Sequence, residues 1–431
     1  MSASSNKEKA LLVHVDLRDR AYRSDWPLEE VAGELRELAH SSRRLEVGDE
    51  LTVRRDRPTP ATLIGKGKGE ELHARCHQQG VQVVVFGQDL SFPQQRNLEE
   101  VIGVKVIDRT QLILDIFAQR ARSREGKVQV ELAQLGYLLP RLAGKGVLLS
   151  RLGGGIGTRG PGEQKLEMDR RRIRQRISRL DRELEEIRQR RQIARRKREK
   201  EAVSSIALVG YTNAGKTTLL NALTHAQSAV GDQLFTTLDP LTRRLVLPDH
   251  QAVLLTDTVG FIHELPPHLV KAFRATLEEV TESDLLLHVL DASSPLMDHK
   301  ASAVHTIVQL LEAEQKSTLL VLNKIDLVAA ETRKAMARSY PEAIQVSAFT
   351  AEGLSLLFER LPSLLSHRFQ EGLVRIPLGQ EGWLDRIYRE GRVLTRQEEG
   401  TALLLRARLP QRLYGQLLKA GLLLKDPHST S

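Results

Sequence analysis

The chain has 431 residues, of which 41% are hydrophobic and 28% charged, and its net charge is +9. This length suits three or four domains, and no apolar run approaches the ~20 residues that a membrane span needs. The N-terminal residues lack the apolar core of a signal peptide, and the single cysteine, Cys76, excludes an intramolecular disulfide. We therefore expect a cytoplasmic protein without a transmembrane segment. For its assembly we expect a monomer.

Residues 1–109 are predicted to form a small α/β domain. Apolar runs typical of strands are Ala10–Val15, Leu45–Arg54, Val81–Phe86 and Val104–Ile107. They alternate with segments of helical spacing, which are Pro27–His40, Gly69–Gln79 and Pro93–Ile102. Strands that alternate with helices favour a parallel sheet with right-handed crossovers.

Residues 110–202 show no strand pattern and are predicted to form a helical hairpin. A narrow apolar stripe, typical of helix packing, steps by four, three, four and three residues through Ile173, Ile177, Leu180, Leu184 and Ile187. Before this stripe, the Gly-rich stretch Leu152–Gly162 fits neither a regular helix nor a strand.

Most of the excess positive charge lies in this hairpin. Between Glu163 and Glu201 there are 16 Lys/Arg and 9 Asp/Glu, a net charge of +7. Such a block indicates a polyanionic partner, while a solvated helix face with ion pairs would have the same composition. The arginines suited to the phosphates of such a partner are Arg170, Arg171, Arg172, Arg174 and Arg176, with Arg151 directly before the Gly-rich stretch and Arg159 within it. Phosphate contacts give affinity with little sequence selectivity.

Residues 203–366 return to regular alternation of strands and helices. The strand-like runs are Ser204–Val209, Leu245–Leu247, Ala252–Leu255, Leu285–Leu290, Thr318–Leu322 and Ile344–Val346. This number predicts a doubly wound nucleotide-binding domain with a mixed sheet. The tail, residues 371–431, is predicted to be a small α+β module. Its expected strands are Leu373–Pro377 and Ala402–Leu409, and its expected helices are Asp385–Glu390 and Gln411–Ala420.

A phosphate-binding loop follows the first of these strands. The run is Gly210, Tyr211, Thr212, Asn213, Ala214, Gly215, Lys216 and Thr217, which fits G-x-x-x-x-G-K-[ST] between a strand and a helix. Glycines let backbone N–H groups wrap the phosphates, and the helix N-terminus adds partial positive charge. We expect Lys216 to contact the β- and γ-phosphates and the Thr217 hydroxyl to bind Mg²⁺.

Two switch segments follow the loop. Asp257, Thr258, Val259 and Gly260 begin about forty residues after Thr217, where the carboxylate can hold Mg²⁺ through water and the Gly260 N–H can sense the γ-phosphate. The earlier segment is Phe235, Thr236, Thr237, Leu238 and Asp239. A threonine there would complete the Mg²⁺ coordination. We choose Thr237, with Thr236 as the alternative, and assign catalytic roles to Lys216, Thr237 and Gly260.

Guanine selection is predicted from the run Asn323, Lys324, Ile325 and Asp326. In an N-K-x-D pattern the Asp carboxylate accepts hydrogen bonds from guanine N1 and N2, a donor pair that adenine lacks. The final element, Ser347, Ala348 and Phe349, offers a backbone N–H to guanine O6. Four ordered motifs together predict a GTP-binding site.

The residue after Gly260 limits catalysis. Phe261 stands where many small GTPases have a glutamine that orients the attacking water, and a phenyl ring cannot polarise water. We therefore predict slow intrinsic hydrolysis that a partner accelerates by ordering the two switch segments. His263 and Glu264 lie close behind and are candidates to replace the glutamine, although ordinary loop residues are the simpler interpretation.

The sequences YTNAGKTTLLNAL, FTTLDP, DTVGFI and NKID together resemble the HflX family of translation-associated GTPases. Three N-terminal segments, Leu63–Gly69, Val106–Phe117 and Gly153–Glu163, also match, so that the resemblance covers about residues 10 to 366. It implies a GTPase that binds the large ribosomal subunit and its rRNA and splits or rescues stalled ribosomes under stress. Phe261 conforms to the family, whereas Thr236 stands where a smaller alanine is expected.

Two other functions remain open from the residues alone. The first is a regulatory GTPase that acts on protein or membrane partners, with the basic helix on lipid headgroups. The second is a nucleic-acid remodelling ATPase that uses Gly65–Gly69 as a second phosphate loop, although this run lacks a complete Walker pattern. The sequence does not distinguish splitting, rescue and inhibition of ribosomes.

Overall fold

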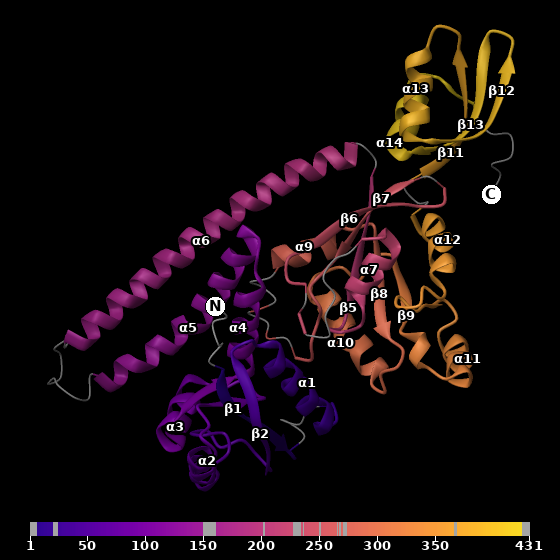
Figure 1. Ribbon diagram of the computed structural model, residues 1–431. Coiled ribbons are helices and arrows are strands. Elements are labelled where there is room, and N and C mark those ends of the chain that lie inside the picture. Colours follow the sequence, from indigo (N-terminus) through magenta and orange to yellow (C-terminus); the bar gives the residue numbers. More distant parts are fainter. Residues whose placement is uncertain are drawn as a thin grey trace, which may run out of the picture.

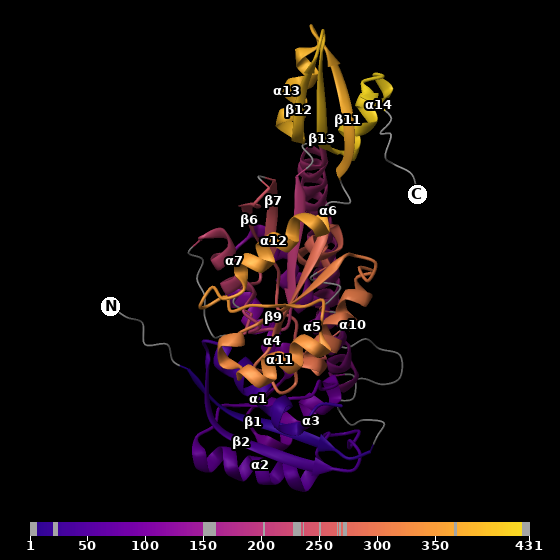
Figure 2. The same cartoon turned by 90° about the vertical axis from the view of Figure 1, so that its right-hand side faces the viewer.

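The computed structural model describes residues 7–19, 25–149, 161–200, 203–226, 234–235, 237–249, 251–264, 266, 269, 274–365 and 369–424. These residues form three sheets and a long helical hairpin (Figure 1). The N-terminal and C-terminal sheets lie at opposite ends of the molecule, and the central sheet of residues 203–366 lies between them (Figure 2). None of the described helices is long and apolar enough to cross a membrane.

The N-terminal sheet is fully parallel, as the sequence predicted. Its strands, in the order β2-β1-β3-β4, are β1 (Glu8–Leu17), β2 (Leu45–Arg55), β3 (Val83–Phe86) and β4 (Lys105–Asp108). The helices are α1 (Leu28–Ser41), α2 (Lys66–Gln79), α3 (Phe92–Ile102) and α4 (Arg109–Arg120). Helix α2 begins three residues earlier than expected, because Gly65 with φ +83° provides its entry turn. Cys76 is buried in this domain, and burial raises the pKa of its thiol to about 11.

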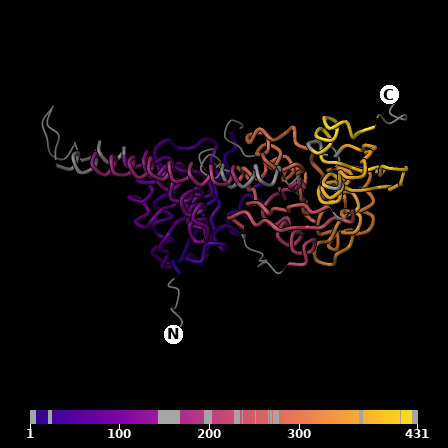
Figure 3. Tube along the Cα trace, turned by 90° about the horizontal axis from the view of Figure 1, so that it is seen from above, coloured from indigo at the N-terminus to yellow at the C-terminus, as the bar shows by residue number. Residues whose placement is uncertain are grey.

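The hairpin consists of α5 (Arg124–Leu149) and α6 (Pro161–Lys200). The predicted stripe on α6 packs against α5, where Leu180 and Leu184 are buried next to Val128. Pro161 and Gly162 belong to α6, which corrects the expectation that the whole Gly-rich stretch is irregular; proline fits a first helical turn because no N–H is needed there. Arg151 and Arg159 lie outside the described residues. Helix α6 runs along one side of the molecule (Figure 3).

The central sheet is mixed and doubly wound, in the order β10-β9-β8-β5-β7-β6. Its strands are β5 (Ser204–Gly210), β6 (Leu241–Val246), β7 (Ala252–Asp257), β8 (Leu285–Asp291), β9 (Thr318–Asn323) and β10 (Ile344–Gln345). All neighbours are parallel except β6, which pairs antiparallel with β7. The helices are α7 (Lys216–Thr224), α9 (Arg274–Glu282), α10 (Met297–Leu310), α11 (Ala330–Ser339) and α12 (Leu354–Leu365).

The C-terminal module has the predicted α+β character. Its elements are β11 (Phe369–Pro377), α13 (Glu381–Glu390), β12 (Arg392–Glu399), β13 (Ala402–Pro410), α14 (Gln411–Lys419) and β14 (Leu423–Leu424), with antiparallel strands. The sequence analysis missed β12 and β14. Strand β12 is an exposed edge with few apolar residues, so that no alternating pattern identified it.

One buried cluster joins the N-terminal and central sheets. Leu12 and Leu35 of the N-terminal domain belong to the same apolar cluster as Phe235 and Phe261 of the central domain. The rings of Phe117 and Phe235 meet edge to face, with centroids 4.6 Å apart. The segment that carries the switch residues is therefore packed directly on the N-terminal half of the chain.

Candidate nucleotide site

The loop after β5 is shaped by two glycines that no other residue can replace without a clash. A Cβ at Gly210 would collide with the carbonyl oxygen of Val289 on β8. Gly215 has φ +87° and lies against the Asn323 side-chain amide, where a Cβ would also collide. The loop is therefore wrapped tightly between three strands, with its backbone leading into the N-terminus of α7.

Lys216 lies inside this loop. Its side chain is 7% exposed, and its ammonium group donates hydrogen bonds to the carbonyl oxygens of Gly210 at 3.0 Å and Tyr211 at 2.9 Å. Burial lowers the pKa of Lys216 to about 8, while the neighbouring Asp257 carboxylate favours its charged form. A Cβ on Gly260 would be 3.1 Å from the ammonium nitrogen, so both predicted phosphate-sensing residues are adjacent.

Three oxygen atoms converge beside this lysine. The Thr217 hydroxyl donates to Asp257 Oδ2 at 2.7 Å, the Thr237 hydroxyl donates to the same oxygen at 2.8 Å, and the two hydroxyls are 3.1 Å apart. Asp257 is fully buried, and its Oδ1 has no hydrogen-bond partner among the described residues. Desolvation raises the pKa of this carboxyl. A hard cation such as Mg²⁺ prefers oxygen ligands of this kind, so the donor set fits Mg²⁺.

The other switch residues have different environments. Thr236 lies outside the described residues. Phe235, Leu238 and Val259 are buried with apolar neighbours, and the Thr258 hydroxyl donates to the Leu208 carbonyl at 2.6 Å. The side chains of these four residues therefore serve packing, and only their backbone is available to a nucleotide.

The guanine-side residues gather at the carboxyl ends of β9 and β10. Asn323 is buried and bridges two loops: its amide donates to the Ala214 carbonyl at 2.9 Å, and its Oδ1 accepts from the Ala348 N–H at 3.0 Å. Lys324 pairs with Asp291 at 2.7 Å. Ile325 and Ser347 are buried, whereas Asp326 is exposed and Phe349 is 86% exposed. Asp326 thus lies exposed on the short 3-10 helix Ile325–Leu327 that follows β9.

Phe261 packs in the core and does not face the site. Its side chain is fully buried, and its backbone pairs with the phosphate loop, because its carbonyl accepts from the Thr212 N–H at 2.7 Å. The side chain cannot orient water from this position. His263 is also turned away, since its ring stacks on Trp26 with centroids 4.4 Å apart. Glu264, the other candidate to replace the glutamine, is 67% exposed, and its carboxylate lies 3.4 Å from His263 Nε2. A role for His263 or Glu264 in orienting water stays a prediction.

The run Gly65–Gly69, considered as a second phosphate loop, opens α2 at the surface. Lys66 pairs with Glu70 at 3.8 Å and Lys68 pairs with Glu71 at 2.6 Å. The two lysines are thus matched by carboxylates of their own helix. This arrangement accounts for the run as a structural turn and helix start.

Three family descriptions match successive parts of the chain. The GTP-binding GTPase N-terminal family matches residues 29–118, the GTP-binding GTPase middle region matches residues 120–198, and the 50S ribosome-binding GTPase family matches residues 205–324. GTPase HflX of Caldanaerobacter subterraneus is 52% identical over 323 residues, which cover 75% of this chain and 74% of that relative. The chain belongs to the HflX family of GTPases. The resemblance expected from the sequence motifs is thereby confirmed, and the chain hydrolyses GTP.

Other relatives extend this similarity over nearly the full length. GTPase HflX of Lacrimispora saccharolytica is 45% identical over 416 residues, which cover 96% of this chain and 90% of that relative. Among solved structures, a GTP-binding protein from Sulfolobus solfataricus in complex with GDP is 24% identical, with a TM-score of 0.44. The similar region covers 83% of this chain and 99% of that protein.

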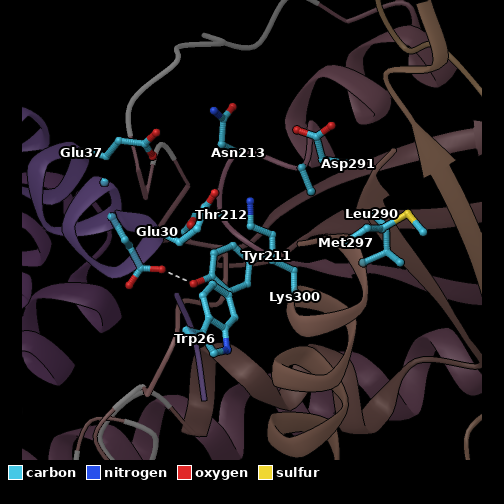
Figure 4. A pocket seen from close by; sticks show the side chains of 13 residues that line it. Trp26, Glu30, Glu37, Tyr211, Thr212, Asn213, Leu290, Asp291, Met297 and Lys300 are labelled. Carbon is cyan, nitrogen blue, oxygen red and sulfur yellow. Dashed lines mark hydrogen bonds between the residues drawn. The ribbon is translucent and has the colours of Figure 1, made fainter. Parts of the chain in front are cut away.

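In this HflX-family chain, a carboxylate from the N-terminal domain contacts the phosphate loop. Glu34 on α1 accepts hydrogen bonds from the Tyr211 hydroxyl and the Arg109 guanidinium, and the latter also donates to the His263 carbonyl. The His263 N–H donates to the Tyr211 hydroxyl at 2.6 Å. Trp26 and Tyr211 line a pocket next to the loop (Figure 4). The N-terminal domain therefore contacts both the phosphate loop and the second switch segment.

The sequence analysis missed Glu34 and Arg109. They are 75 residues apart from each other and Glu34 is 177 residues from Tyr211. The available signal was an acidic row on α1, Glu30, Glu34 and Glu37, which follows a helical spacing beside its apolar face. All three line the pocket in Figure 4.

The first switch segment, which ends at Asp239, also contacts the residues that precede α5 in the N-terminal half of this chain. The Asp239 carboxylate accepts hydrogen bonds from the backbone N–H groups of Arg122 at 2.9 Å and Ser123 at 2.8 Å, and from the Ser123 hydroxyl. These residues directly precede α5, and Ser123 is its N-cap, because the Ser123 Oγ accepts from the Gly126 N–H at 2.9 Å. Asp239 therefore supports this cap from a distant part of the chain. Its carboxylate faces α5, although the sequence analysis had assigned Asp239 to the nucleotide.

Replacing Asp239 by alanine is expected to destabilise the start of α5. Loss of a hydrogen bond costs about 1 kcal/mol, and amide hydrogen exchange should accelerate at Arg122 and Ser123, whose N–H groups donate to this carboxylate. The matched control is Asp239→Asn, which keeps an oxygen acceptor and should retain most of the protection. Equal protection in the alanine variant and the unaltered protein would contradict this supporting role.

Proposed function

We propose that this GTPase binds the large ribosomal subunit and its rRNA through α6, and that it splits or rescues stalled ribosomes under stress. The observation that carries the proposal is the charge of α6, because its basic residues project from a helix whose apolar stripe is occupied by α5. The matched family of the central domain, described as 50S ribosome-binding GTPase, supports the choice of a ribosomal partner.

The arginines of α6 differ in their availability to RNA. Arg176 pairs with Glu131 of α5 at 2.6 Å and holds the hairpin together. Arg170, Arg172 and Arg174 pair at 3.6–3.8 Å with acids of their own helix, and exposed pairs of this kind are weak. Arg171 and Arg179 are exposed and form no ion pair with any described residue. We therefore propose that Arg171 and Arg179 are the arginines of α6 most available to RNA phosphates.

The chemistry follows from the site residues. Thr217 and Thr237 would hold Mg²⁺, with Asp257 behind them, and the cation supplies charge stabilisation to the β- and γ-phosphates. Lys216 would leave its carbonyl partners for the phosphates, and the Gly260 N–H would contact the γ-phosphate. With Phe261 buried, no side chain orients water at that position. Turnover is therefore expected to depend on a partner that orders the switch segments.

A ribosomal partner gives the protein a cytoplasmic location. A single chain contains the complete set of nucleotide-site residues, since the phosphate loop, both threonines and the guanine-side residues come from one central domain. We therefore propose that the protein acts as a monomer.

GTP turnover measured with and without purified large subunits tests this function. Large subunits are expected to accelerate turnover of the unaltered protein, and Arg171→Gln with Arg179→Gln should weaken the acceleration without changing basal turnover. The control is Arg338→Gln with Arg360→Gln, which removes two charges from α11 and α12 of the central domain. Turnover that does not respond to large subunits, or binding to anionic vesicles in place of subunits, would contradict the proposal.

A further inference from the structure

Among the described residues, no helix covers one face of the C-terminal sheet. Its elements follow the order strand, helix, strand, strand, helix, strand, and its sheet order is β12-β13-β11-β14. This is the split β-α-β arrangement of ferredoxin-like domains. Helices α13 and α14 pack on one side, where Leu405, Ala407 and Leu409 are buried, and Figure 1 shows both helices on the same side of the strands. The matched families end at residue 324 and do not include this module.

Four arginines share the uncovered face. Residues directly opposite each other in antiparallel strands point to the same side of a sheet. Arg408 on β13 is opposite Arg392 on β12 and Glu371 on β11, and Arg406 lies two residues away on the same strand face. Arg375 on β11 is opposite Leu404, which lies on the same face of β13 as Arg406 and Arg408, so Arg375 belongs to this face as well. Each of the four side chains is 47–53% exposed.

The four arginines on this face have only two acidic partners from the same sheet, Glu371 and Glu399. Arg406 and Arg408 share Glu371, at 2.6 Å and 4.0 Å, and Arg375 is 3.8 Å from Glu399. Arg392 reaches Asp249 of the central domain at 3.8 Å. Two like charges directly opposite each other disfavour the sheet, and exposed ion pairs offset this only weakly. An anionic partner would relieve the repulsion between Arg392 and Arg408.

The residue types on the face indicate phosphate. Eight of the nine basic residues in 369–424 are arginines, against six acids, a net charge of +3. The planar guanidinium binds phosphate in a bidentate geometry, which a lysine cannot do. Apart from Phe369 at the start of β11, strands β11, β12 and β13 include no aromatic residue, so the several stacked bases seen on RRM sheets have no matching platform on these strands.

We propose that this uncovered face is a second RNA-binding surface, which contacts the phosphate backbone of structured RNA through Arg375, Arg392, Arg406 and Arg408. The choice of RNA among anionic partners rests on the proposed function, whereas the location of the surface does not. Because the contacts are to phosphates, binding is insensitive to base sequence and strongly dependent on salt.

The test is fluorescence anisotropy of the full-length protein with a labelled 20-base-pair RNA duplex, a probe length of about two helical turns. Arg406→Gln with Arg408→Gln is expected to weaken binding by about tenfold at low salt and to lower the log–log salt slope by about 1.5, since each lost phosphate contact removes about 0.7–0.9. The control is Arg389→Gln with Lys419→Gln, which removes the same charge from the helices on the covered side and should leave binding within about twofold.

Several outcomes distinguish this inference from its alternatives. Equal weakening by the two variant pairs would overturn it, because only net charge would then matter. Loss of binding to vesicles of phosphatidylserine and phosphatidylcholine, with RNA binding unchanged, would identify a lipid surface and overturn it as well. Arg406→Lys with Arg408→Lys keeps the charge and should recover only part of the affinity, and an unchanged thermal unfolding midpoint confirms folding. If RNA binding is unaffected while large subunits still stimulate turnover, this inference fails and the proposed function stands.

Discussion

Replacing Lys216 by alanine is expected to reduce GTP turnover by about 10²- to 10³-fold, the usual loss when one preorganised donor to a developing phosphate charge is removed. The ammonium group would be 3.1 Å from a Cβ on Gly260, the predicted γ-phosphate contact, and it is held by two carbonyl oxygens of its own loop. Because Lys216 is expected to leave these carbonyls for the phosphates, the variant also removes a phosphate contact, and nucleotide affinity should fall as well. Steady-state turnover and nucleotide titration measure the two effects.

Lys300 provides a matched control for Lys216. Its ammonium group lies over the Tyr211 ring, 5.6 Å from the centroid, and donates to Ser294 Oγ at 2.9 Å (Figure 4 shows it beside the loop). Lys300→Ala removes an equal charge from the neighbourhood but no group from the phosphate loop. Its turnover should stay within about threefold of the unaltered protein. A comparable loss in both variants would mean that general charge, and not the position of Lys216, governs turnover.

The motifs of the nucleotide site could be predicted because each depends on local geometry. Gly215 needs a positive φ and close contact with Asn323, and Lys216 and Thr217 follow at the start of a helix, so residue type and spacing carry the information. The alternation of strands and helices also identified both α/β sheets, since buried parallel strands are nearly continuous apolar runs.

The contacts between domains could not be predicted in the same way. Glu34 and Tyr211 meet through a hydrogen bond between side chains 177 residues apart, and polar residues on a helix usually face solvent. Asp239 likewise resembles a turn residue before a proline until α5 is brought against it. Edge strands such as β12 were missed because exposure on both faces removes the alternation on which strand prediction depends.

Asp326→Asn is expected to reduce GTP affinity by about 10²-fold or more. Two hydrogen bonds from guanine to a carboxylate are each worth about 1.5–3 kcal/mol, and an amide presents a donor where guanine also presents donors. The carboxylate is exposed on the short 3-10 helix Ile325–Leu327 that follows β9. Asn323 and Lys324 are held by Ala214, Ala348 and Asp291, so the change should not disturb the loop.

The direction of the specificity change provides the sharper test of Asp326. Xanthine carries a carbonyl in place of the guanine 2-amino group, and this carbonyl accepts from an asparagine amide. Competition titrations with GTP and xanthosine triphosphate should therefore show a reversal of preference in Asp326→Asn. The control is Glu331→Gln, an exposed acid nearby on α11 that makes no predicted base contact and should keep the preference for GTP. If Asp326→Asn loses affinity for both nucleotides equally, the carboxylate supports the loop and does not read the base.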